Sequence, residues 1–275
     1  MRVRPGAYLP ADSSVNAVAR ARCEHLAFGK LVIGGFAGLN YHGIPYWSEV
    51  FPVIVHSPNS IGFVSSDIIR LCRSKVAYEF GKDPVFPKLA VASPAVCVID
   101  ALIQLKQGRI TWWVPPIEGF EPWEVRAVQL IDAARRKCKV SWNQLADAST
   151  QRFSKTSLLK LAKQSVSGAD SPQETSLRLI AGDLAPNLQL QKAVYDTPRS
   201  EIPFTFIDLT WKGLKVAVYY DGEDHYNRER RNKDFAIRKK LEDRGWQVIT
   251  VTAPELAFPE QLRRRIQKAV WKAQM

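Results

Sequence analysis

The sequence predicts an α/β protein of two domains, the second of them built on a mixed sheet in the order α-β-β-β-α-β. With 275 residues, the chain is long enough for two ordinary domains. Its 46% apolar and 24% charged residues are typical of a globular protein with a core. After residue 171, helical and strand-like patterns alternate, which favours helices packed on a sheet. A small, polar, turn-rich segment at 167–172 separates the predicted domains, 1–166 and 167–275.

The first domain is predicted to be α+β. Short apolar runs at 31–33 and 51–56 are typical of strands. Residues 95–105 predict a helix with Ser93 as its cap and Pro94 in its first turn. Further helices are expected at 122–137, at 141–148 with a Ser141–Gln144 capping box, and at about 155–165.

The second domain begins with a helix at 171–181, where Ser171 and Pro172 are favourable first residues. Gly213 predicts a tight turn between two strands, and Gly245 predicts the end of a long basic helix. The remaining elements are expected as strands at 188–195, 204–209, 214–221 and 246–252 and helices at 228–244 and 260–272.

The positive charge of the chain favours a polyanionic partner, DNA in particular. The formal net charge is +12. Residues 226–275 hold 13 Lys and Arg against 6 Asp and Glu. Basic side chains placed on phosphates release condensed counterions, which favours binding to nucleic acid. A basic, solvated helix face is the alternative interpretation of the same charges.

Cysteine usage and hydropathy predict a cytoplasmic protein without a membrane partner. The four cysteines form no C-x-x-C pair, which favours reduced thiols over a zinc site or disulfides. The first ten residues contain no apolar signal core. The most apolar stretch, 89–105, is interrupted by Pro94 and Asp100 and is too short to span a bilayer.

Four residues of the second domain form a candidate catalytic site: Glu174, Asp208, Asp221 and His225. Carboxylates that meet on adjacent strands provide oxygen ligands for Mg²⁺ or Mn²⁺. Such an ion activates water and stabilises charge on a phosphate. A nearby histidine can accept the proton from that water.

The same region resembles the very short patch repair endonucleases, which belong to the PD-(D/E)xK nuclease superfamily. The resemblance covers about 171–255 and depends on a set of short motifs. They are Ser171-Pro172-x-Glu174, Ile207-Asp208-Leu209, Val216 to His225 with its Asp-Gly-x-x-His element, Arg231 to Asp234, and Gly245 to Ile249.

This resemblance implies a restriction-endonuclease-like fold and assigns a role to each candidate residue. Asp208 is expected to be the main metal ligand, and Asp221 or the Tyr220 carbonyl to supply further coordination. Glu174 is expected to support the site, and His225 to act as the base. The DNA backbone is expected to lie against the basic helix, at Arg228, Arg230, Arg231, Lys233 and Arg238.

Tyr219 is the main departure from the family pattern, because the relatives usually have a glutamate there. Tyr219 and Asp221 share one face of a strand, about 6–7 Å apart, so Asp221 could partly replace that glutamate. Structural interpretations also stand beside the catalytic ones. Glu174 fits a capping box, Asp221 fits a strand-ending turn, and His225 fits a capping or packing role.

The first half of the chain loosely resembles abortive-infection-type antitoxins that are fused to nuclease-like domains. The matching pieces are Arg4 to Pro10, Gly35 to Pro45, and Ser93 to Leu102. The resemblance implies a protein partner for residues 1–166. His42 and His56 are interpreted as structural residues.

Three hypotheses follow for the function. The first is a metal-dependent DNA endonuclease or nickase, in repair or phage defence, which Asp208, Asp221 and His225 favour. The second is a non-catalytic DNA-binding or antitoxin-like regulator that keeps a nuclease fold, which Tyr219 favours. The third is a protein-interaction module whose first half neutralises a partner.

Overall fold

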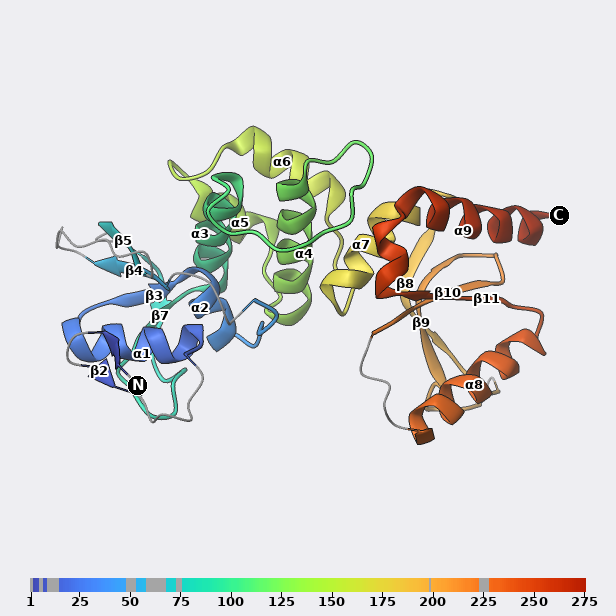
Figure 1. Ribbon diagram of the computed structural model, residues 1–275, viewed down its shortest axis with the longest axis horizontal. Coiled ribbons are helices and arrows are strands. Elements are labelled where there is room, and N and C mark those ends of the chain that lie inside the picture. The colour runs from blue at the N-terminus through green and yellow to red at the C-terminus, as the bar shows by residue number, and fades with distance from the viewer. Residues whose placement is uncertain are drawn as a thin grey trace. The chain divides into compact units, whose positions relative to one another are not determined.

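The computed structural model describes two compact units of the chain (Figure 1). The described residues are 2–4, 7–8, 15–47, 53–57, 68–72, 76–197, 199–222 and 228–275; the side chains of 2–4, 7, 68–72 and 228–231 lie outside this description. The N-terminal unit consists of residues 1–111 and 133–163, and the C-terminal unit of 112–132 and 164–275.

The N-terminal unit is built on a mixed sheet in the order β5-β4-β3-β7-β6. Its strands are β3 (Val32–Gly34), β4 (Val53–Ser57), β5 (Ile68–Cys72), β6 (Tyr78–Glu79) and β7 (Ala90–Ala92). A separate antiparallel pair consists of β1 (Arg2–Arg4) and β2 (Ala7–Tyr8). β3 runs parallel to β7 and antiparallel to β4. All three strands bury apolar side chains against α1 (Ala17–Phe28).

Further helices of this part of the chain are α2 (Gly35–Tyr41), α3 (Pro94–Lys106), α5 (Trp142–Ser149) and α6 (Lys155–Gln164). The predicted Ser141–Gln144 capping box is present at α5. Pro94 occupies the first turn of α3 as predicted, but the expected Ser93 cap is wrong, because its side chain makes no capping hydrogen bond. The predicted elements therefore form, while α1, α2, β5, β6 and β7 had no counterpart in the sequence-based expectations.

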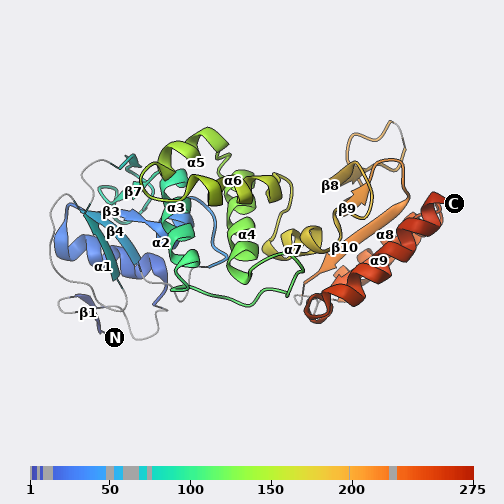
Figure 2. The ribbon, with the colours of Figure 1, turned by 90° about the horizontal axis from the view of Figure 1, so that it is seen from above.

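The C-terminal unit is a four-stranded mixed sheet with helices on both faces (Figure 1), and Figure 2 shows the same unit from above. The strands are β8 (Leu188–Val194), β9 (Thr205–Trp211), β10 (Val216–Asp221) and β11 (Gln247–Thr252), in the order β11-β10-β9-β8. The helices are α7 (Pro172–Ala181), α8 (Arg228–Glu242) and α9 (Pro259–Gln274), with a short helical turn η1 (Ala253–Ala257). β8, β9 and β10 pair antiparallel, and β11 pairs parallel to β10.

Two apolar clusters hold this sheet between its helices. One contains Leu209, Trp211 and Val218 with side chains of α7 and α9. The other contains Ile207 and Ala217 with side chains of α8. Mixed α/β architecture is therefore confirmed, with α7-β8-β9-β10-α8-β11 in the predicted order.

Residues 112–132 belong to the C-terminal unit by their contacts. This segment includes the start of α4 (Pro122–Lys137). Val114, Ile117 and Val125 are buried in the same cluster as Leu177 of α7. The predicted boundary near 167 lies close to Gln164, where the chain enters the C-terminal unit for the second time. Among the described residues, no helix is both long and apolar enough to cross a membrane.

Candidate functional site

A partly buried amide connects two of the predicted site carboxylates. The side-chain Nε2 of Gln191, on β8, donates hydrogen bonds to Glu174 Oε2 at 2.9 Å and to Asp208 Oδ1 at 2.8 Å. Glu174 lies in the first turn of α7, where the Ser171 hydroxyl oxygen accepts from its backbone N–H. The sheet and the helix that precedes it are thus connected at the candidate site.

The second oxygen of Asp208 accepts a hydrogen bond from the backbone. Oδ2 lies 2.8 Å from the amide nitrogen of Tyr220 on β10. The registered pair between these strands is Val218 with Leu209, so Asp208 lies next to the paired positions. The Asp208 carboxylate therefore accepts the hydrogen bond of the Tyr220 N–H in place of a backbone carbonyl.

Gln191 has an unusual backbone conformation for a residue inside a strand. Its φ is +49°, a left-handed region that non-glycine residues visit rarely and at a cost. Side chains along a strand alternate between the two faces of a sheet, so Leu190 and Val194 of β8 should share a face, and so should Ile207 and Leu209 of β9. Instead, Leu190 and Leu209 pack with side chains of α7 and α9, whereas Val194 and Ile207 pack with side chains of α8. The alternation of both strands is therefore interrupted at Gln191 and Asp208, which form the partly buried polar contact.

Burial and a neighbouring carboxylate change the acidity of this pair. Burial raises the pKa of Asp208 to about 7, and the charge of Glu174 acts in the same direction. Burial also raises the pKa of Glu174, although several hydrogen bonds oppose the shift. No described cation is hydrogen-bonded to Asp208; its partners are the neutral groups of Gln191 and Tyr220. A partly buried carboxyl with a perturbed pKa beside a pocket is a candidate for a functional site.

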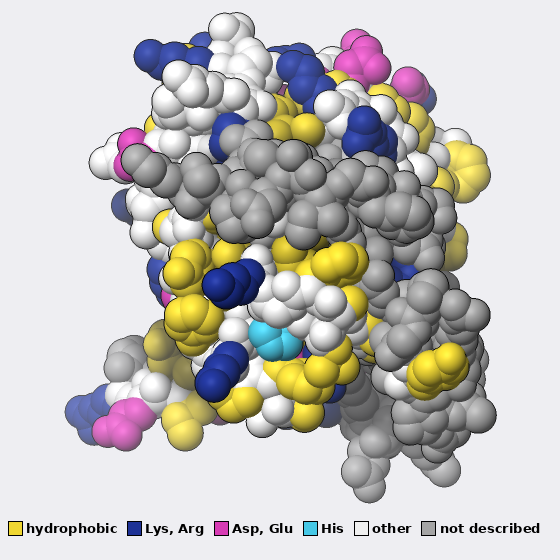
Figure 3. Space-filling view, turned by 90° about the vertical axis from the view of Figure 1, so that its left-hand side faces the viewer, with side chains coloured by type: hydrophobic (Ala, Val, Ile, Leu, Met, Phe, Trp, Pro, Cys, Tyr) yellow, Lys and Arg dark blue, Asp and Glu magenta, His cyan; other side chains and the backbone are white. Residues whose placement is uncertain are grey.

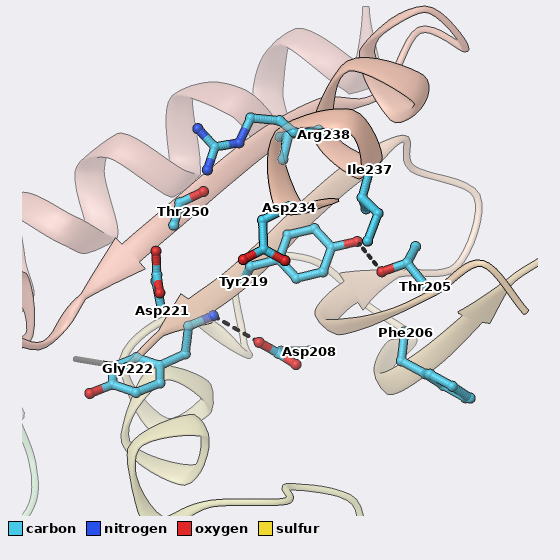
Figure 4. A pocket seen from close by; sticks show the side chains of 12 residues that line it. Thr205, Phe206, Asp208, Tyr219, Asp221, Gly222, Asp234, Ile237, Arg238 and Thr250 are labelled. Atoms are coloured by element: carbon cyan, nitrogen blue, oxygen red, sulfur yellow. Dashed lines mark hydrogen bonds between the residues drawn. The ribbon is translucent and has the colours of Figure 1, made fainter. Parts of the chain in front are cut away.

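Asp208 and Asp221 line one pocket of about 370 Å³ (Figure 4). Asp234 and Arg238 of α8 also line it, and both are exposed. Figure 4 shows Asp221 on the side of the pocket next to Thr250, with Asp234 extending from α8. Three carboxylates and one guanidinium therefore surround a space that solvent can enter.

Tyr219 occupies the position where the resembled family has a glutamate. Its hydroxyl lies 3.2 Å from the Thr205 hydroxyl, and Figure 4 shows it on the side of the ring away from Asp221. Burial raises the pKa of Tyr219 to about 12, so the phenol is neutral at ordinary pH. Tyr219 therefore adds a hydrogen-bonding group to the pocket and no negative charge.

The structure brings together most of the predicted site residues that it describes. Asp208 and Glu174 are bridged by Gln191, and Asp221 and Arg238 line the pocket with Asp208. Lys233 is an exposed residue of α8 that does not line the pocket. His225 lies outside the described residues, as do the side chains of Arg228, Arg230 and Arg231.

The donor set for a metal ion consists of carboxylate oxygens. Mg²⁺ often uses only one or two protein carboxylates and keeps several waters. Asp208 and Asp221 provide such a pair in one pocket. Within the described part of the chain, no group of three or more His, Cys, Asp or Glu side chains has metal-binding geometry. The described carboxylates of this pocket therefore do not enclose a metal ion by themselves.

Several basic residues near the C-terminus have acidic partners within the fold. Lys240 and Arg244 both bind Asp196, at 2.6 Å each. Arg263 binds Asp183 at 2.5 Å, and Arg265 binds Glu255. The positive charge of residues 226–275 is therefore partly balanced by acidic residues of the fold, which weakens the simple charge argument for DNA binding.

Sequence analysis missed Gln191 and gave Asp234 no role of its own. Asp234 was one letter of the Arg231 to Asp234 motif, so the motif could have pointed to it. Gln191 gives no signal, because a glutamine in an alternating strand resembles any solvent-facing residue. Comparisons of the chain with protein-family models, curated proteins and solved structures find no match.

Proposed function

We propose that the C-terminal unit is a Mg²⁺- or Mn²⁺-dependent DNA endonuclease or nickase, with a restriction-endonuclease-like fold and a role in repair or phage defence. The observation that carries this proposal is the pocket that Asp208 and Asp221 line from neighbouring strands, with Arg238 at its edge. The order α7-β8-β9-β10-α8-β11 is compatible with such a fold.

Four residues have defined tasks in this proposal. Asp208 and Asp221 hold the metal ion through carboxylate oxygens. When bound, that ion supplies activation of water and stabilisation of negative charge on the phosphate. Arg238 contacts a phosphate of the DNA backbone and orients it. His225, by the motif it shares with the resembled family, is the proposed base.

Glu174 and Gln191 are positioning residues in this proposal. The Gln191 amide holds the Asp208 carboxylate from one side while the Tyr220 N–H holds it from the other. The carboxylate is therefore oriented before any ion arrives, and less conformational freedom is lost on binding. Glu174 fixes the amide of Gln191 in turn.

A plasmid-nicking assay tests this function. Wild type with Mg²⁺ or Mn²⁺ is expected to convert supercoiled plasmid into nicked or linear DNA, and EDTA is expected to abolish this. Asp208→Asn, nearly the same shape as the native residue, is expected to lower cleavage at least a hundredfold. The matched control is Asp183→Asn, which changes an exposed carboxylate of the same unit that binds Arg263. Equal cleavage by wild type and Asp208→Asn would refute the assignment.

A non-catalytic DNA-binding regulator is the second candidate, and Tyr219 is the observation that favours it. The tyrosine removes one carboxylate from the family pattern. In that case, gel-shift experiments are expected to detect salt-sensitive DNA binding without cleavage, and binding that persists in Asp208→Asn. Loss of binding in Arg238→Ala would then identify α8 as the interface. A chain that binds no DNA at low salt would favour a protein-interaction role for residues 1–166.

A further inference from the structure

The N-terminal unit contains a cavity of about 590 Å³ that lies apart from the candidate nuclease pocket. Cavities of 300–1,000 Å³ are typical of sites for small organic ligands. The described lining is mostly apolar, with two lysines and one histidine among its members. The lining residues are Gly29, Lys30, Leu31, Val32, His56, Val76, Tyr78, Phe80, Pro87, Lys88 and Ala90.

Hydrogen bonds fix one wall of this cavity, the loop that leads to Lys88. Asp83 is buried and accepts from Arg22 Nε at 2.7 Å and from the Tyr41 hydroxyl at 2.5 Å. It also accepts from the backbone N–H groups of Val85 and Phe86. The Gly81 N–H donates to the carbonyl of Pro87 and closes the loop. A wall held in this way does not have to be ordered when a ligand binds, which favours affinity.

One of the lining residues of the cavity, His56, is a histidine that is only 1% exposed. Its Nε2 lies 2.8 Å from Asp100 Oδ2, and Arg152 binds the other oxygen of Asp100. In the tautomer that donates Nε2–H to Asp100, Nδ1 is a hydrogen-bond acceptor. Nδ1 is buried and has no hydrogen-bond partner in the described part of the chain. Buried polar atoms nearly always have a partner, so this acceptor points to a missing donor.

The His56–Asp100 contact is built into the backbone around it. A Cβ on Gly34 would lie 2.3 Å from Asp100 Oδ2 and 2.7 Å from His56 Nε2. Any larger residue at Gly34 would therefore displace the pair. The backbone N–H of Gly35 donates to the same Asp100 oxygen at 3.3 Å. The orientation of the histidine ring is thus set by residues behind it and is independent of any ligand.

The mouth of the cavity carries positive charge and aromatic surface. Lys30 and Lys88 are exposed, and no Asp or Glu is among the described lining residues. Tyr78 and Phe80 are 50% and 61% exposed, and their ring centroids lie 5.3 Å apart. Figure 3 shows one face of the molecule, on which hydrophobic side chains gather with Lys or Arg side chains among them. Exposed aromatic rings beside lysines are suited to a flat anion.

We infer that this cavity binds a small organic anion with a flat ring, of the class of purine nucleoside monophosphates. Lys30 and Lys88 attract the phosphate, and Tyr78 or Phe80 stacks on the base. His56 Nδ1 accepts a hydrogen bond from an N–H group of the base. The site is separate from the proposed nuclease function and would stand if that function failed.

Isothermal titration of the full chain with AMP and with GMP tests this inference. At least one nucleotide is expected to bind wild type with a Kd below about 1 mM, an ordinary value for a small ligand. The double variant Lys30→Glu/Lys88→Glu is expected to weaken binding at least tenfold. Lys82→Glu is the matched control, because Lys82 belongs to the same loop, pairs with Glu79 and does not line the cavity. The control is expected to bind within twofold of wild type.

Several outcomes would overturn the inference. The first is the absence of binding by either nucleotide to a chain whose circular dichroism is that of a folded protein. The second is equal binding by the double variant, and the third is binding that is lost in Arg238→Ala, which would place the nucleotide at the C-terminal pocket. Inorganic phosphate is the competitor that tests the ring: phosphate that binds as tightly as the nucleotides would contradict base recognition.

A direct readout at His56 complements the titration. In protein labelled with ¹⁵N in its four histidines, the Nδ1 resonance of His56 is expected to shift when the nucleotide binds. The resonance is assigned by its absence from His56→Gln. If that variant fails to fold, assignment by triple-resonance experiments on wild type replaces it. An unchanged His56 resonance under saturating nucleotide would contradict the proposed hydrogen bond.

Discussion

Two aspartates, one buried in the N-terminal unit and one partly buried in the C-terminal unit, differ in their neighbours and therefore in their acidity. Asp83 is held by Arg22, Tyr41 and two backbone N–H groups, and these donors, against the effect of burial, bring the pKa of Asp83 well below its ordinary value. Asp208 is held by neutral amides and lies near Glu174, and burial raises its pKa to about 7. The first arrangement stabilises a charge. The second leaves a charge poorly compensated beside a pocket, and such a carboxylate is available to a metal ion.

The largest expected effect comes from removal of the well-compensated charge. Asp83→Ala leaves Arg22, Tyr41 and two N–H groups without their acceptor, and we expect it to destabilise the protein by about 2–4 kcal/mol. Urea unfolding at pH 7 measures this. Asp147→Ala, at an exposed aspartate of the same unit, is the control and is expected to change stability by less than about 0.5 kcal/mol. If Asp83→Ala lowered the free energy of unfolding no more than the control does, Asp83 and its hydrogen-bond partners would not stabilise the fold as expected.

The second expected effect has the opposite sign and depends on pH. The pKa of Asp208 is raised in the folded state, so between about pH 4 and 7 the folded protein keeps a proton on Asp208 that the unfolded chain has released. The free energy of unfolding of wild type is therefore expected to fall as the pH rises through this range. Asp208→Asn removes this cost and is expected to stabilise the protein by about 1–3 kcal/mol at pH 8 and by close to nothing at pH 4. Thermal unfolding across that range measures the difference.

Asp83→Asn provides the matched comparison for this pH dependence. The pKa of Asp83 is lowered in the folded state, so its contribution is present above about pH 4 and is lost as pH falls through lower values. Asp83→Asn is therefore expected to lower the free energy of unfolding at pH 8, and to lower it by a smaller amount at low pH. Parallel pH profiles for the two variants would refute the distinction between the aspartates.

A smaller effect is expected at the amide that joins the two carboxylates of the C-terminal unit. Gln191→Leu keeps much of the side-chain volume but removes the donor shared by Glu174 and Asp208. We expect a loss of about 1–2 kcal/mol at pH 8, because two partly buried acceptors lose a partner. Gln189→Leu, two residues earlier on β8, is the control with unchanged stability. A loss of the same size at pH 5, where both carboxyls bind protons more readily, would show that charge is not the cause.

The smallest expected effect concerns Tyr219. Tyr219→Phe removes one hydrogen bond to Thr205 and is expected to cost about 0.5–1 kcal/mol. A double-mutant cycle with Thr205→Val isolates this contact, and the coupling is expected to match the single loss. Nicking activity is expected to stay unchanged, since Tyr219 holds no metal ion in the proposed mechanism. A hundredfold loss of nicking in Tyr219→Phe would instead assign the phenol to the reaction.

Local patterns were sufficient to predict most elements of the C-terminal unit. The Ser171 cap, the turn at Gly213 and the glycine after α8 all depend on interactions within a few residues. The strands that follow α7 were predicted as strands, and β9 and β10, which the turn at Gly213 joins, are neighbours in the sheet. In the N-terminal unit, the short strands β5, β6 and β7 were not predicted, because two to five residues are too few to define a period.

What the sequence determined by itself is the order of elements in the C-terminal unit and the carboxylates that belong to one site. Only the tertiary structure decided that Gln191 joins Glu174 to Asp208, that residues 112–132 pack with α7, and that several C-terminal cations have acidic partners. The physical reason is the range of the interactions. Helix caps and turns are made by neighbours in the chain, whereas burial, pKa and ion pairing depend on residues that only the completed fold brings together.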